Sequence, residues 1–157
     1  MRRVLPLLAA AVLTLSAAPP TGLIGPFRLG DPLPAGSDLT TGGCDGRPMA
    51  SASVLTRFGP AWVQAMADPT SLRIVDVEVM PSTLPRVAEL SQCEALAVSI
   101  AADAGVAVLG GVDRGQDGTA LTSRWHARAG ASLSARWFPG GGSCDVTARW
   151  SRRPNEG

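Results

Sequence analysis

Three cysteines and one histidine are the side chains of this 157-residue chain best suited to nucleophilic, redox or metal chemistry. Cys44 lies in a glycine-rich stretch, and such a thiol becomes a nucleophile only where a nearby base or cation lowers its pKa. His126 is the only histidine, and hydrolytic dyads and triads need such a base beside the nucleophile. Cys44 and His126 are therefore the candidate catalytic residues.

No motif accompanies these two residues. The chain has no Gly-x-Ser-x-Gly elbow, no P-loop and no dinucleotide-binding fingerprint. No metal site is predicted, because the histidine and the cysteines lack the close spacing of zinc ligands. The segment from Asp113 to Gly118 has part of a calcium-loop pattern, but Gly115 and Arg124 stand at two ligand positions, so a hairpin turn is predicted. The sequence predicts no cofactor and favours a protein that is not an enzyme.

Cys93 and Cys144 are predicted to form a disulfide. Cys93 falls on the apolar stripe of an expected helix and Cys144 on the apolar face of an expected strand, so both point into the same layer. In the chain-entropy model, closing this loop of about fifty residues stabilises the fold by roughly 4 kcal/mol. Cys44 would then be the unpaired thiol; the alternative is that Cys44 pairs with one of the other two.

Four basic residues are the candidate binding residues: Arg124, His126, Arg136 and Arg149. Each is expected on the outward face of a strand, where the guanidinium groups would form a shallow anion-binding surface. An ordinary solvated sheet face has the same pattern. The candidate partners are an anionic component of the cell envelope and another exported protein.

Alternating apolar and polar side chains predict the strands that carry these residues. The expected strands are 23–29 at a sheet edge, then 73–79, 106–112, 119–127, 131–138 and a last strand around Val146. Two short loops set the register of the last three strands. The predicted pairs are Trp125 with Leu133, Leu121 with Trp137, Trp137 with Cys144, Ala135 with Val146 and Arg136 with Asp145.

Helices are predicted at three places. A long amphipathic helix is expected from Ser82 or Thr83 to about Ala104, with its apolar stripe against the sheet. Two short helices are expected at 49–57 and 61–67. The predicted fold class is α+β: two layers, with a mainly antiparallel sheet of about five strands under one long helix. Trp125, Trp137 and Trp150 share the apolar face and are predicted to pack in this core.

The first eighteen residues have the layout of a signal peptide. Two arginines precede an apolar run of about a dozen residues, which is shorter than the roughly 20 that span a bilayer as a helix. The expected organisation is a signal peptide at 1–18, a Pro/Gly-rich segment at 19–48, one domain at 49–151 and a flexible tail at 152–157. No later apolar run is long enough to span a membrane.

Together these features predict a small exported protein of the periplasm or the extracellular space. The formal net charge of +1 gives no general attraction to nucleic acid. The leading hypothesis is a non-enzymatic binding or structural domain of the cell envelope. The alternatives are a small secreted enzyme that uses Cys44 or His126, and an inhibitor or assembly partner of another exported protein.

Overall fold

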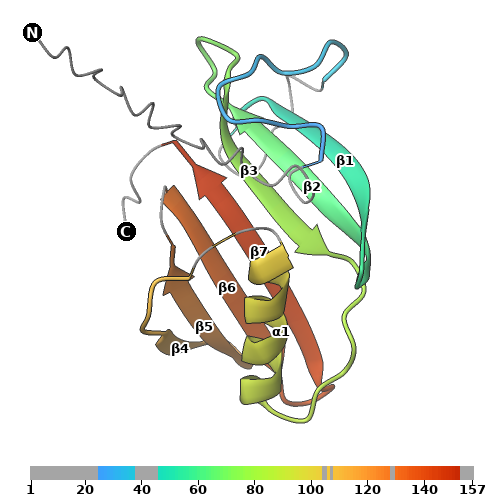
Figure 1. Cartoon of the computed structure of the whole chain (residues 1–157), viewed down its shortest axis with the longest axis vertical. Coiled ribbons are helices and arrows are strands. Elements are labelled where there is room, and N and C mark those ends of the chain that lie inside the picture. The colour runs from blue at the N-terminus through green and yellow to red at the C-terminus, as the bar shows by residue number, and fades with distance from the viewer. Residues whose placement is uncertain (1–24, 38–45, 104–105, 107, 128–129, 153–157) are drawn as a thin grey trace, which may run out of the picture.

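The computed structural model describes residues 25–37, 46–103, 106, 108–127 and 130–152. These residues form seven strands and one helix (Figure 1). Their bounds are β1 Met49–Thr56, β2 Gly59–Ala67, β3 Ile74–Pro81, α1 Leu90–Asp103, β4 Asp113–Asp117, β5 Ala120–His126, β6 Ala131–Phe138 and β7 Ser143–Ser151. All neighbouring strands are antiparallel, in the order β1-β2-β3-β7-β6-β5-β4. In this part of the chain no helix is long and apolar enough to cross a membrane.

The predicted fold class is wrong in its count of strands and helices, since the two expected short helices are the strands β1 and β2. They form a hairpin in which Thr56 lies opposite Gly59. The Thr56 hydroxyl accepts a hydrogen bond from the Phe58 N–H at 3.1 Å, and Gly59 adopts the left-handed φ of 99° that this tight turn needs. Alternate residues of β2 are fully buried, which is the period of a strand rather than a helix.

Three further expectations at the edges of elements are also wrong. The expected turn at 113–118 is mostly strand β4, whose five residues are all exposed and so show no alternation. Among the described residues of the expected strand 106–112, one bridge forms, between Val108 and Ala127. In the described part of segment 23–29, turns and chain without regular secondary structure replace the expected strand.

The long helix begins at Leu90, seven or eight residues later than predicted. The chain before it is held by tertiary contacts rather than by its own helical bonds. The Val87 N–H donates to the Gly142 carbonyl at 2.8 Å, and the Val87 carbonyl accepts from the Trp137 indole at 3.2 Å. The residues of α1 that are buried have the spacing of one helix face: Cys93, Ala97, Ile100 and Ala101.

The predicted register of the C-terminal strands is confirmed at each of the five pairs. Arg136 lies opposite Asp145, and Trp137 lies between Leu121 on one side and Cys144 on the other. Gly130, before β6, has a left-handed conformation, with φ 72°. The hydrophobic pattern and the turns therefore specify this half of the sheet together.

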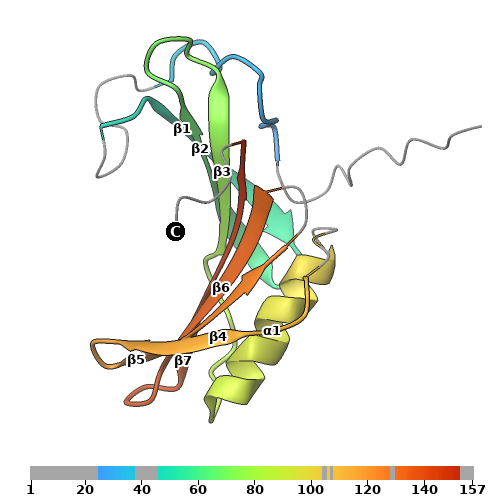
Figure 2. The ribbon, with the colours of Figure 1, turned by 90° about the vertical axis from the view of Figure 1, so that its left-hand side faces the viewer.

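The core lies between the sheet and two covers on the same side of it. Helix α1 covers β5, β6 and β7, while the segment that contains Phe27 lies over β1, β2 and β3 (Figures 1 and 2). Phe27 is 3% exposed, and the Gly30 N–H donates to the Ile74 carbonyl at 2.8 Å. Trp125 is buried, and Trp137 and Trp150 pack partly buried against this core, so the predicted packing role of these tryptophans agrees with their positions.

The predicted signal peptide and Cys44 lie outside the described residues, as does the predicted tail except for Arg152. The Arg152 N–H donates to the Val75 carbonyl at 2.9 Å, so the chain is still bonded to the sheet at that residue.

Candidate functional site: the outer face of the sheet

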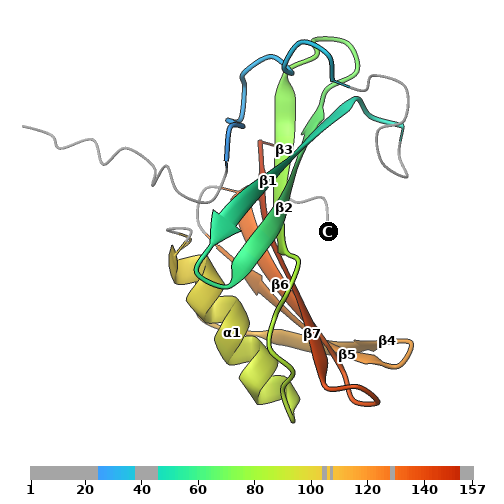
Figure 3. The same cartoon turned by 90° about the vertical axis from the view of Figure 1, so that its right-hand side faces the viewer.

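No described helix or strand lies over the face of the sheet that points away from α1, which is called the outer face below (Figures 2 and 3). One row of directly paired polar residues crosses six strands on this face. The row runs from Ser51 through Gln64, Glu78, Arg149 and Ser132 to His126. The candidate site is built on this row and its neighbours.

Asp76 is the most buried charged group on the outer face, with its side chain 4% exposed. It forms an ion pair with Arg47, which precedes β1, and a second with Arg149 on β7 at 3.0 Å. Burial raises the pKa of Asp76, but hydrogen bonds from Arg47, Ser151 and Arg149 outweigh that effect and hold the pKa below its ordinary value. Asp76 is therefore ionised at neutral pH and fixes both arginines.

The structure places Arg124, His126, Arg136 and Arg149 together on the outer face, but the side chains of three of them contact acidic side chains. Arg149 contacts Glu78 at 3.6 Å in addition to Asp76. The pairs of the other two are Arg136 with Asp117 at 3.1 Å and His126 Nε2 with Asp113 at 3.8 Å. Within the described residues Arg124 alone of the four has no ion pair or hydrogen bond through its side chain.

His126 lies in an environment that does not favour catalysis. Its side chain is 69% exposed, and that of Asp113 is 82% exposed. Ser132 is directly across the strand pair, but an open, hydrated sheet face gives none of the water exclusion that strengthens electrostatic catalysis. The His126–Asp113 contact is therefore an exposed surface contact.

An apolar group on the outer face was missed by the sequence analysis. Trp62 on β2 is 53% exposed and lies opposite Ser53 on β1 and Met80 on β3. Leu55, two residues after Ser53, is 83% exposed. The strand period of Ala61, Val63 and Ala65 is the signal that would have placed Trp62 on the opposite face.

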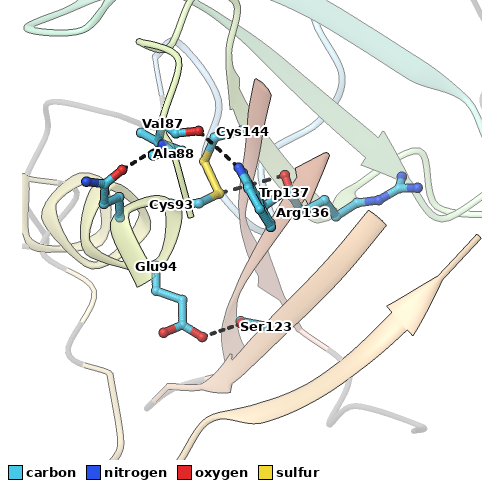
Figure 4. The surroundings of a disulfide bond; sticks show 9 residues. Val87, Ala88, Cys93, Glu94, Ser123, Arg136, Trp137 and Cys144 are labelled. Atoms are coloured by element: carbon cyan, nitrogen blue, oxygen red, sulfur yellow. Dashed lines mark hydrogen bonds between the residues drawn. A yellow bond between two sulfur atoms is a disulfide. The ribbon is translucent and has the colours of Figure 1, made fainter. Parts of the chain in front are cut away.

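The inner face carries the structural contacts that hold α1 to the sheet (Figure 4). Cys93 and Cys144, the predicted pair, are joined in a disulfide with Cα atoms 5.6 Å apart. Glu94 accepts a 2.6 Å hydrogen bond from the fully buried Ser123 hydroxyl and two bonds from Arg114 at 2.7 and 2.8 Å. Hydrogen bonding by Arg114 is the main cause of the lowered pKa of Glu94, with burial opposing it and the Ser123 bond adding to it.

Metal and thiol chemistry gain no support from the described positions. No group of three or more His, Cys, Asp or Glu side chains gathers there in an arrangement that would bind a metal. Asp113 and Asp117, the acidic residues of the partial calcium-loop pattern, lie four residues apart on β4 and contact His126 and Arg136. The predicted role of Cys44 lies outside the described residues and stays a prediction.

Comparisons with known proteins found no family model that matches the chain and no curated protein or solved structure with significant similarity to it.

Proposed function

We propose that the protein is a non-enzymatic binding domain that recognises another exported protein through the outer face of its sheet. One observation carries the proposal: among the described residues, the inner face is covered by α1 and the Phe27 segment, whereas no helix or strand lies over the outer face, where Trp62, Leu55 and Arg124 are exposed. Tryptophan and arginine are the residues that most often dominate binding energy in protein interfaces.

The charge pattern favours a protein partner over an anionic polymer. Basic groups on the outer face alternate with acidic ones, because Arg149 pairs with Asp76 and Glu78, and Arg136 pairs with Asp117. A polyanion is attracted by an excess of positive charge, which this face does not have. A folded protein surface can present complementary charges of both signs.

The spacing of the exposed anchors suits an interface of ordinary size. Trp62 on β2 and Arg124 on β5 are four strand positions apart, which is about 19 Å at the usual strand spacing. A standard interface buries about 800 Å² on each partner, a patch wide enough to include both side chains. The Arg47–Asp76–Arg149 cluster between them keeps the charged groups in fixed positions, which lowers the entropy cost of binding.

Export forms part of the proposal. The signal-peptide layout of residues 1–18 motivates it, and the Cys93–Cys144 disulfide is compatible with an oxidising compartment. The partner would therefore be a protein of the same compartment.

Photo-crosslinking in the native host tests the proposal and does not require that the partner be identified first. A photoreactive residue at Gln64, on the outer face, is expected to give a discrete adduct with another protein. The same probe at Val98, an exposed position on α1, is the matched control and is expected to give none. Adding Trp62→Ser and Arg124→Ser to the Gln64 probe should abolish the adduct.

Two results would contradict the proposal. One is an adduct pattern that is the same for Gln64 and Val98, or that survives the two substitutions. The other is retention of the wild type on phosphatidylglycerol vesicles that Arg124→Ser abolishes, with no protein adduct. That second result would replace the protein partner by an anionic envelope component.

A further inference from the structure

We propose that two copies of the chain associate through the outer edges of their β1 strands, which pair antiparallel about a two-fold axis at Ala52. β1 is the last strand of the sheet, and only its β2 side is paired within the described residues. Such an edge presents a row of backbone N–H and C=O groups that fits a further extended strand. The inference concerns this edge and does not depend on the outer-face proposal.

β1 carries none of the features that usually protect an edge strand. Its eight residues, Met49–Thr56, include no charge, proline or glycine, and each of them pairs with β2 without a bulge. The opposite edge strand, β4, has only five residues, of which Asp113, Arg114 and Asp117 are charged. Charges and short length are the common defences of edge strands, so β4 is protected and β1 is open to pairing.

The sequence of β1 matches itself in one antiparallel register. With Ala52 opposite its own copy, Met49 faces Leu55, Ala50 faces Val54 and Ser51 faces Ser53. Every pair then joins residues of the same face and the same character: apolar with apolar, and hydroxyl with hydroxyl. Leu55, which is 83% exposed, would lie against Met49 of the other copy. A self-matching strand gives an isologous, closed dimer, so we identify the occupant as a second copy of this chain.

Contacts at both ends hold β1 in its strand conformation before association. Arg47, just before the strand, pairs with the buried Asp76. Arg57, just after it, pairs with Asp103 at the end of α1 and donates to the Ser99 carbonyl at 3.3 Å. Because the edge is already ordered, pairing costs little further conformational entropy.

Sedimentation velocity on the full chain tests the association. The wild type is expected to double in mass as concentration rises through the micromolar range. The Ser51→Lys/Ser53→Lys variant should stay monomeric, because it places like charges directly opposite one another, and so should the Ser51→Glu/Ser53→Glu variant. An equal mixture of the two variants should dimerise again. The Gln116→Lys/Thr119→Lys variant adds the same charge near β4 and should behave as the wild type.

Cross-linking tests the register independently of charge. In a Cys44→Ser background, Ala52→Cys is expected to give a disulfide-linked dimer under mild oxidation, because each copy places this residue opposite itself. Ser51→Cys, which faces Ser53 of the other copy, is the control and should cross-link far less. A wild type that is monomeric throughout, a mixture of charge variants that fails to dimerise, or equal cross-linking at the two positions would each overturn the proposal.

Discussion

The two halves of the sheet are held in different ways. β5, β6 and β7 lie under α1, and the Cys93–Cys144 disulfide ties that helix to β7. β1, β2 and β3 have no helix over them within the described residues; Phe27 and its neighbours cover their inner face. On the outer face, the buried Asp76 joins Arg47 to Arg149 and so links the start of β1 to β7. A covalent bond fixes one half, and an ion-pair cluster fixes the other.

This difference means that the halves should respond to different conditions. Reduction acts on the disulfide and leaves the ion pairs intact. Acid protonates Asp76 and leaves the disulfide intact. If each treatment exposes only its own half, the sheet consists of two units of separate stability. If both halves always open together, the paired strands β3 and β7 transmit the loss of structure from one half of the sheet to the other.

Removing the disulfide should have the largest effect. The Cys93→Ala/Cys144→Ala variant is expected to lose roughly 4 kcal/mol of unfolding free energy, because the two cysteines are 51 residues apart and the unfolded chain regains the entropy of that loop. Urea denaturation measures the loss. Hydrogen exchange should then show lower protection in α1 and β7 before it changes in β1 and β2.

Cys44→Ser is the control for the disulfide variant, because Cys44 is predicted to be unpaired. Its urea midpoint should match that of the wild type. A loss of unfolding free energy as large as that of the double variant would show that Cys44 takes part in a different disulfide. The Cys93–Cys144 bond could then no longer be what holds the β5–β7 half together.

Removing both arginines around Asp76 should have the next largest effect. The Arg47→Ala/Arg149→Ala variant leaves a carboxylate that is 4% exposed without its cationic partners, and we expect a loss of about 3 kcal/mol at neutral pH. Hydrogen exchange should rise first in β1, β2 and β3. The Arg136→Ala variant, which removes an exposed pair with Asp117, is the control and should cost less than about 1 kcal/mol.

The pH dependence of the arginine variant distinguishes a charge effect from a packing effect. In the wild type the pKa of Asp76 is lowered in the folded state. The ionised side chain therefore adds to the free energy of unfolding above the unfolded pKa of about 3.9, and this stabilisation is lost as the pH falls through the folded pKa. Without the arginines, only the hydrogen bond from Ser151 opposes the effect of burial, so the pKa of Asp76 should be higher than in the wild type. The difference in unfolding free energy between the variant and the wild type should therefore become smaller at acidic pH. A difference in unfolding free energy that does not change with pH would show that packing is the cause.

The same two halves differ in how well the sequence predicts them. The strands from β5 to β7 alternate large apolar residues with polar ones, so their faces and register follow from the pattern. In β1 and β2 the inward positions are mostly alanine, which is also the best helix former, while Trp62 points outward. The alternation there is weak, and helix propensity favours the wrong structure.

The candidate site was predictable only in part, for a related reason. The outward direction of Arg124, His126, Arg136 and Arg149 follows from strand register, which is local. The pairing of Asp76 with residues 29 and 73 positions away depends on the order β2-β3-β7, which no local pattern indicates. Sequence therefore identified the basic groups but not the acids that neutralise them.

The smallest effect is expected at Glu94, the polar contact between α1 and β5. Glu94→Ala leaves the fully buried Ser123 hydroxyl without its acceptor and should cost about 2 kcal/mol. Glu94→Gln keeps an acceptor oxygen and should cost less. Urea denaturation of both variants, each with the disulfide intact and absent, measures whether the helix needs this contact in addition to the covalent bond. A loss of unfolding free energy that appears only when the disulfide is absent would mean that the covalent bond alone is enough to fix the helix. The β5–β7 half would then depend on its disulfide and not on polar contacts, unlike the half that the Asp76 ion pairs hold.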